Sequence, residues 1–144
     1  LGVFDLPGVV ELARKRFAGT TLEQRVAIHP GSFRKDALPQ GYDLVTLVRI
    51  LHDHDDDVAQ ALLGKIHESL AAGGRLLIVE PMAGTRGVEK MGDAYFGLYL
   101  WALGSGRPRT FQEISEMARL AGFSRVKEVT TNLPIIARIA VITK

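Results

Sequence analysis

The chain has 144 residues, no cysteine, 47% hydrophobic residues and a formal net charge of +2. This length suits one folded domain, and the absence of cysteine excludes disulfides and thiolate metal sites. The basic residues are scattered, so a nucleic-acid-binding surface is not indicated, and no apolar run is long enough to span a bilayer. The first residues lack a signal-peptide pattern, and we expect a cytoplasmic protein.

Apolar periodicity and chain breakers predict strands and helices in alternation. The run from Leu44 to Leu51 is nearly continuous in aliphatic residues, as in a strand buried on both faces of a parallel sheet. Gly73 and Gly74 are expected to end the helix before them, and Thr110 with Glu113 forms a capping box. The predicted elements, in chain order, are strand 1–4, helix 6–16, strands 25–28 and 43–51, helix 55–70, strand 75–80, helices 88–103 and 110–121, and strands 124–129 and 135–143.

The order of these elements predicts an α/β fold. Alternating strands and helices imply right-handed crossovers and a parallel sheet. The turn Asn132–Pro134 predicts that the last two strands form an antiparallel hairpin. The chain opens inside its first predicted strand, so we expect it to be part of a longer protein.

His52 is the first candidate for chemistry, because it lies where the predicted strand 43–51 runs into an acidic turn. In open α/β sheets, ligands bind beyond the carboxyl ends of the strands. A histidine there is a candidate general base, since its unperturbed pKa lies near neutrality. Glu80 ends the neighbouring predicted strand, where its carboxylate can orient the imidazole. The alternative is a loop histidine with its hydrogen bonds satisfied and a surface glutamate.

Asp5 directly follows the first predicted strand. An acidic residue in that place can accept hydrogen bonds from both ribose hydroxyls of a nucleotide cofactor. It can equally serve as the N-cap of the helix that Pro7 opens. Position alone does not separate the two interpretations.

The stretch from His52 to Asp57 is also a candidate metal site, because two histidines and a carboxylate can hold iron or zinc. Histidines two residues apart diverge unless the backbone bends. The three aspartates have a simpler explanation at the N-terminus of the next helix, where negative charge is favoured. We therefore predict no metal site.

The predicted helix 88–103 is rich in aromatic residues, which cover more than one helical face, so not all of them can point into one core. Those on a second face can line a pocket for a large apolar ligand, with core packing as the alternative for each. The residues concerned are Tyr95, Phe96, Tyr99 and Trp101.

Four motifs occur in an order and spacing that resembles S-adenosylmethionine-dependent O-methyltransferases of the plant caffeate and acetylserotonin type. They are Phe4–Pro7, Pro30–Phe33, Leu51–Asp56 and Gly73–Pro81. The resemblance covers essentially all 144 residues. Within that family, Gly92–Tyr99 and Gly104–Arg109 are similar to the bacterial carotenoid branch, the demethylspheroidene (hydroxyneurosporene) O-methyltransferases.

The resemblance implies S-adenosylmethionine as the cofactor. Asp5 matches the acid that holds the cofactor ribose, and Ser32 and Phe33 lie where the family contacts adenine. The family often has an acid at the position of Ser32. The implied cofactor-binding residues are Asp5, Leu6, Ser32, Phe33 and Arg49.

The resemblance also implies the catalytic and acceptor-binding residues. His52 matches the catalytic base, Asp53 its adjacent acid and Glu80 one acid that flanks the base, while the second flanking acid of the plant enzymes falls at Pro108. An apolar acceptor wall suits a polyene better than a phenolic acid. The implied wall residues are Met91, Tyr95, Tyr99 and Leu103.

For the whole protein, the resemblance implies a Rossmann-like class I methyltransferase sheet, of which residues 1–144 form the C-terminal part. The family's first strand, its glycine-rich cofactor loop and an N-terminal dimerisation domain precede the matched residues. We therefore expect an inactive fragment and a homodimeric complete protein, with peripheral membrane association as a route to a lipophilic substrate.

The implied reaction is methyl transfer to a hydroxyl of a large apolar acceptor, such as a hydroxylated carotenoid. Three alternatives stay open at this point. One is methylation of another small-molecule hydroxyl or phenol. The others are a nucleotide-dependent oxidoreductase, which would use Asp5 in the same way, and a non-catalytic binding module of the same fold.

Overall fold

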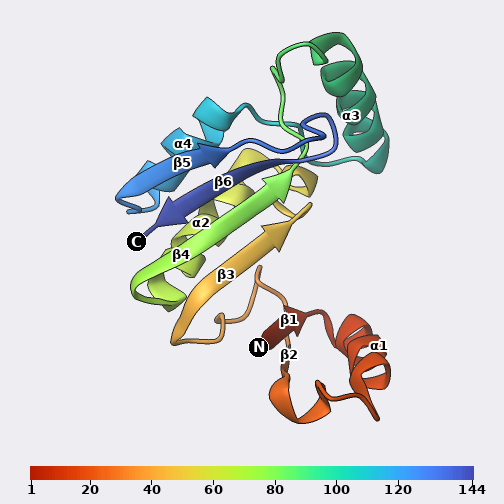
Figure 1. Cartoon of the computed structure of the whole chain (residues 1–144), viewed down its shortest axis with the longest axis vertical. Coiled ribbons are helices and arrows are strands. Elements are labelled where there is room, and N and C mark those ends of the chain that lie inside the picture. Colours follow the sequence, from red (N-terminus) through yellow and green to blue (C-terminus); the bar gives the residue numbers. More distant parts are fainter. The chain divides into compact units, whose positions relative to one another are not determined.

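A computed structural model of the chain describes the backbone of residues 1–144 and all side chains except those of residues 91 and 92. The chain forms two compact units, Leu1–Gln40 and Gly41–Lys144. Both units contain parallel strand pairs, and the second also contains antiparallel strands (Figure 1). The predicted α/β class is confirmed.

The first unit is a parallel strand pair with one helix. Strand β1 (Gly2–Asp5) pairs with β2 (Ala27–Pro30), and helix α1 (Pro7–Phe17) packs against both strands. Pro7 lies in the first turn of α1, where a missing backbone N–H costs nothing. A short 3₁₀ helix, η1 (Glu23–Arg25), leads into β2.

The second unit is built on a four-stranded sheet with the order β3-β4-β6-β5. Strands β3 (Tyr42–Val48) and β4 (Leu70–Glu80) are parallel neighbours. Strand β6 (Arg138–Thr143) runs antiparallel to both β4 and β5 (Arg125–Val129). The predicted antiparallel hairpin is therefore confirmed, and its last strand also pairs with the parallel part of the sheet.

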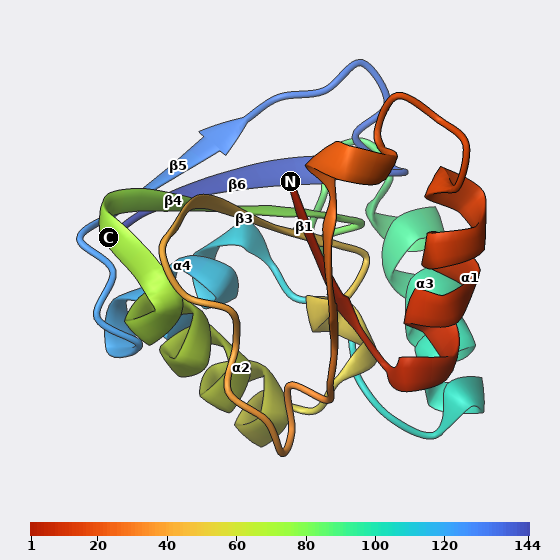
Figure 2. The ribbon, with the colours of Figure 1, turned by 90° about the horizontal axis from the view of Figure 1, so that it is seen from below.

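Helices α2 (Asp56–Ser69) and α4 (Phe111–Leu120) lie on the same face of this sheet (Figure 2). They bury apolar side chains at helical spacing against the inner face of the strands, which forms the core of the unit. The fully buried apolar members include Ala59, Leu63, Leu76, Ile78, Ile114, Ala118, Ala140 and Ile142. The capping box of Thr110 and Glu113 is present as predicted.

Helix α3 (Glu89–Leu103) lies beyond the end of the sheet toward which β4 points (Figure 1). Gly104 ends it in a left-handed conformation with a φ of 84°, which glycine adopts without steric cost. None of the helices among the described residues is both long and apolar enough to cross a membrane.

The prediction of one strand over residues 43–51 is wrong at its end. Strand β3 ends at Val48, and Arg49 takes a left-handed backbone with a φ of 55°. A residue in that conformation turns the chain out of the strand direction. A 3₁₀ helix, η2 (Leu51–Asp53), follows, so His52 lies in a tight turn beyond the strand.

The prediction that this strand is buried on both faces is also wrong. Leu47 is buried, whereas Leu44 and Val48 are 47% and 55% exposed. Residues 44, 46 and 48 share one face of a strand, and α2 and α4 cover the other (Figure 2). Within the described residues, β3 has a hydrogen-bonded neighbour on one side only.

Other boundaries also differ from prediction, among them that of β2, which is 27–30 and not 25–28. Helix α2 ends at Ser69, and β4 begins at Leu70, which pairs with Tyr42 of β3. Gly73 and Gly74 therefore lie within β4, at an irregularity in the register before regular pairing starts at Arg75. The last strand begins at Arg138, since residues 133–137 form a turn.

Candidate active site

Two residues with buried polar side chains come into contact beyond the carboxyl ends of β3 and β4. His52 is 1% exposed and Glu80 is 0% exposed. The backbone N–H of His52 donates a hydrogen bond to Glu80 Oε2 at 3.2 Å. The parallel register of the strands, which pairs Val48 with Val79, brings the two residues together. The alternative of a surface glutamate is wrong, and orientation of the imidazole by the carboxylate stays a prediction.

The two nitrogens of the His52 imidazole have different surroundings. Its Nε2 lies 3.3 Å from Oδ1 of Asp53, a carboxylate that is 41% exposed. Its Nδ1 and the Oε1 of Glu80 are both buried, and neither has a hydrogen-bond partner within the described residues. Unpaired buried polar atoms are costly, and they are tolerated chiefly where a site needs them.

Burial sets the protonation of both groups. It lowers the pKa of His52 below 6.5, an effect that Asp53 opposes and that the charges of Arg49 and Arg109 reinforce. The imidazole is therefore neutral at neutral pH and can accept a proton. Burial also raises the pKa of Glu80 to about 7, against the effect of the His52 backbone N–H and of Arg109. A neutral imidazole is the form that can act as a base, so the burial of His52 suits it to accept a proton at neutral pH.

Arg49 joins this site from the end of β3. Its backbone N–H still donates to Val79 O at 2.9 Å, although its φ is 55°. Its guanidinium lies 5.8 Å from the ring centroid of Phe96 on α3, in the range of a cation–π contact. Left-handed backbone at a residue other than glycine is strained and often marks a functional site.

Arg109 is part of the site and was not among the predicted residues. It is 0% exposed, and its guanidinium donates to Leu51 O at 2.9 Å and to His54 O at 2.7 Å. It also donates twice to Asp56 Oδ1, at 2.9 and 2.7 Å. In the sequence it is one basic residue in a loop, and only its place within the family-like segment Gly104–Arg109 could have drawn attention to it.

In the first unit, the predicted cofactor residues gather at the carboxyl ends of β1 and β2. Asp5 is opposite Pro30 in the register, and its carbonyl accepts from the N–H of Gly31 at 2.9 Å. The loop that contains Ser32 and Phe33 therefore begins beside Asp5. A Cβ at Gly31 would lie 2.7 Å from the ring of Phe4, so a larger residue there would require the ring to move.

Asp5 is not the N-cap of α1, so that alternative is wrong. The N-cap is Leu6, which makes no side-chain cap bond. The carboxylate of Asp5 instead accepts from the N–H of Leu6 at 2.7 Å and is exposed. An exposed carboxylate at a strand end is available to a ligand.

The predicted acceptor residues lie along one stripe of α3. Tyr95, Tyr99 and Leu103 are spaced four residues apart and are 63%, 43% and 58% exposed. Met91, the fourth predicted wall residue, lies outside the residues whose side chains are described. Core packing is wrong for Tyr95, Tyr99 and the 77% exposed Trp101.

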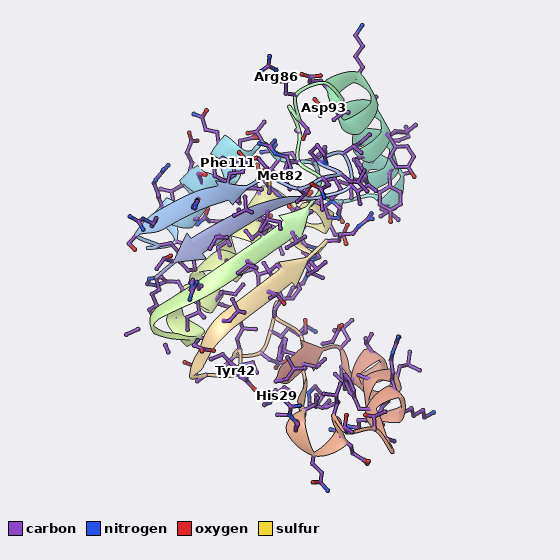
Figure 3. All side chains as sticks on the ribbon, in the orientation of Figure 1. His29, Tyr42, Met82, Arg86, Asp93 and Phe111 are labelled. Atoms are coloured by element: carbon purple, nitrogen blue, oxygen red, sulfur yellow. The ribbon has the colours of Figure 1, made fainter. Side chains whose placement is uncertain are left out.

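The loop between β4 and α3 is fastened to the helix by Asp93. The two carboxylate oxygens of Asp93 lie 3.1 and 3.3 Å from the N of Gly84, which donates to them (Figure 3). This contact fixes the start of α3 relative to the end of β4, the strand that carries Glu80.

No group of three or more His, Asp or Glu side chains in the described part of the chain is arranged to hold a metal ion. The aspartates of the acidic turn have the predicted place at the N-terminus of α2, with Asp55 as N-cap. The hydrogen bonds of Asp56 with Arg107 and Arg109 hold its pKa below the usual range.

Comparison with known proteins finds one enzyme family that matches most of the chain. The family model of the O-methyltransferase domain matches residues 1–124. The demethylspheroidene O-methyltransferase of Rhodobacter capsulatus is 44% identical over 139 residues, which are 96% of this chain and 34% of that protein. The acetylserotonin O-methyltransferase of Bos taurus is 35% identical over 125 residues, 87% of this chain and 36% of that protein. The chain thus spans about a third of the length of these relatives.

Solved structures of similar fold include human N-acetylserotonin methyltransferase in complex with SAM, with a TM-score of 0.84 and 28% identity over 99% of this chain and 40% of that one. The mitomycin 7-O-methyltransferase MmcR has a TM-score of 0.88 and 27% identity, over 99% of this chain and 41% of that one.

Replacing Glu80 with glutamine should change how the free energy of unfolding depends on pH. The pKa of Glu80 rises from 4.5 to about 7 on folding, so the stability that this raised pKa gives is complete below pH 4.5 and is lost as the pH rises through about 7. Glutamine keeps an acceptor for the His52 N–H and does not ionise. Between pH 5 and pH 8, Glu80→Gln should gain roughly 2–3 kcal/mol over the wild type.

Urea unfolding of the complete protein at the two pH values measures this difference. Glu68→Gln, at an exposed position on α2, is the control and should show the wild-type dependence. If the free energy of unfolding depends on pH in the same way for Glu80→Gln and the wild type, folding does not raise the pKa of Glu80.

Proposed function

The chain belongs to the O-methyltransferase domain family, and we propose that the protein containing it transfers a methyl group from S-adenosylmethionine to a hydroxyl of a large apolar acceptor. The observation that carries this proposal is the buried pair of His52 and Glu80, in which the imidazole is neutral and ready to take a proton. The family match removes the support for a nucleotide-dependent oxidoreductase.

The residues at the carboxyl ends of β1 and β2 fit the nucleoside part of this cofactor. The exposed carboxylate of Asp5 can accept hydrogen bonds from ribose hydroxyls, and the half-buried Phe33 offers a flat apolar face to a base. When bound, S-adenosylmethionine supplies an already activated methyl group, so the protein contributes mainly positioning and a base.

His52 removes the proton of the acceptor hydroxyl. We assign proton uptake to Nε2, which lies 3.3 Å from the carboxylate of the partly exposed Asp53, because Nδ1 is buried. The imidazolium keeps the proton, and its Nε2–H donates a hydrogen bond to Asp53 Oδ1. Glu80, in its ionised form, stabilises the imidazolium, because opposite charges attract strongly in a buried site.

An apolar acceptor is supported by the composition of α3. Residues 94–103 contain no charged side chain, although Tyr95, Tyr99 and Leu103 are exposed. Contiguous exposed apolar surface is uncommon unless it binds something. Together with the similarity to demethylspheroidene O-methyltransferases, at 44% and 42% identity, this favours a hydroxylated carotenoid.

Replacing His52 with glutamine should lower kcat by roughly 10²- to 10⁴-fold, the usual contribution of general base catalysis. Binding of S-adenosylmethionine should change little. Steady-state kinetics of the complete protein and calorimetry with the cofactor measure both quantities. His67→Gln, the same change on α2 outside the turn that carries the base, is the control and should keep near wild-type turnover. A His52→Gln variant with most of its activity would refute the role of base.

Replacing Asp5 with alanine should weaken binding of S-adenosylmethionine by about 1.5–3 kcal/mol, the range for hydrogen bonds to a charged group. Isothermal titration calorimetry on the complete protein gives the dissociation constant. Glu11→Ala, which removes an exposed acid from α1, should leave it unchanged. Equal affinities for Asp5→Ala and the wild type would exclude Asp5 from the cofactor site.

Replacing Leu103 with glutamate should lower turnover of a hydroxylated carotenoid, because a charge in an apolar binding wall is costly to desolvate. Cofactor affinity should be preserved. Leu120→Glu, the same change at a residue of α4 that is 80% exposed, is the control. If Leu103→Glu methylates the carotenoid as fast as the wild type, Leu103 is not part of the acceptor-binding wall. If the wild type methylates only small phenols, the proposed class of large apolar acceptors is wrong.

A further inference from the structure

We propose that Ser105, Gly106 and Arg109, in the segment that joins α3 to α4, hold the turn that carries His52, and that Arg109 is a positioning residue for the base. The proposal rests on the proposed function, because it assigns a role relative to His52 as the base. Three independent contacts between this segment and residues 51–56 carry it.

The first contact is the buried guanidinium of Arg109. It binds the carbonyl of Leu51, immediately before His52, and the carbonyl of His54, two residues after it. It also binds the carboxylate of Asp56 with two N–H groups. One rigid, planar group thus fixes the backbone on both sides of the imidazole and the start of α2.

The second contact is the hydroxyl of Ser105, which donates to Asp53 O at 2.9 Å. Asp53 supplies the carboxylate next to His52 Nε2. A second residue of the same segment therefore holds the backbone of Asp53, between the two carbonyls that Arg109 binds.

The third contact is the close approach of Gly106 to the same turn. A Cβ at Gly106 would overlap the carbonyl oxygen of His52 and would lie 2.6 Å from the carbonyl carbon of Asp53. Its backbone N–H donates to Asp55 Oδ1 at 2.9 Å. Gly106 also has a φ of 82°, which other residues rarely adopt. Glycine here lets the segment pack directly on the backbone of the base.

A lysine could not replace Arg109 in this role. The guanidinium makes four hydrogen bonds to three acceptors that point from different directions. An ammonium is a single point charge on a flexible chain and cannot reproduce that planar arrangement. Arg107, by contrast, is 43% exposed and binds two carboxylates, those of Asp56 and Glu113. Arg107 is therefore the matched control.

The charge of Arg109 has a second effect on the base. The ionisable groups that face His52 are Asp53 and His54 in the same turn, Arg49 at the end of β3, Glu80 on β4, and Arg109. Among these, Arg109 lowers the pKa of both His52 and Glu80. Loss of its charge should move the rising limb of the activity profile to higher pH, because His52 would then stay protonated up to a higher pH.

The test compares Arg109→Lys, Arg109→Met, Ser105→Ala and Arg107→Met in the complete protein, with S-adenosylmethionine and a hydroxylated acceptor. We expect kcat to fall about 10- to 100-fold in both Arg109 variants and about 3-fold in Ser105→Ala. Cofactor affinity should stay within 2-fold of wild type, and Arg107→Met should keep full activity. The pH limb should shift upward in Arg109→Met more than in Arg109→Lys.

A double variant separates this proposal from the role of His52. Once His52 is glutamine, adding Arg109→Lys should cost no further activity, because a positioning residue acts through the group that it positions. If His52→Gln is fully active, the role of base fails. If His52→Gln is inactive while Arg109→Lys and Ser105→Ala keep wild-type kcat and pH profile, the role of base stands and the positioning proposal is overturned.

A folding defect gives a different pattern. It would lower the fraction of protein that binds cofactor, without moving the pH limb, and would add to the loss caused by His52→Gln. That result would also overturn the proposal. Ser105→Ala removes one hydroxyl only and keeps the test open if the Arg109 variants do not fold.

Discussion

The second unit depends on the burial of two ionisable side chains, His52 and Glu80, at the adjoining ends of two parallel strands. Burial disfavours the charged form of each group, so it lowers the pKa of the histidine and raises that of the glutamate. The same constraint that makes the pair costly for folding makes it suited to moving a proton near neutral pH. Packing elsewhere in the unit, around Leu63, Ile78 and Ile142, must offset that cost.

The acidic turn after His52 shows how neighbouring aspartates take different roles. Asp55 receives the backbone N–H of Gly106, and Asp56 receives the guanidinium groups of Arg107 and Arg109. Asp57 accepts the N–H of Val58 in the first turn of α2. The charge near the helix N-terminus is favourable by itself, and two of the three carboxylates also fasten a distant segment to the turn.

The segment between α3 and α4 therefore does more than connect two helices, because it also holds the turn that carries the proposed base. It begins at the end of the helix that carries the proposed acceptor residues and passes over the backbone of the base. Arg49, at the end of β3, makes a further link to α3 through Phe96. The acceptor helix and the base are thus connected through two sets of contacts within the second unit, which offers a physical route by which acceptor binding can affect the base.

The sequence alone determined the α/β class, the final hairpin, the capping box and the place of His52 and Glu80 beyond neighbouring strands. Each of these follows from local pattern or from the alternation of strands and helices. It did not determine the end of β3, since the left-handed Arg49 follows no propensity rule, or the exposure of Leu44 and Val48, since an aliphatic run does not tell which face other elements cover. The role of Arg109 could not be predicted from the sequence for a related reason. Its partners lie more than 50 residues away in the chain, and a buried guanidinium is specified by the geometry of acceptors that only the tertiary structure brings together.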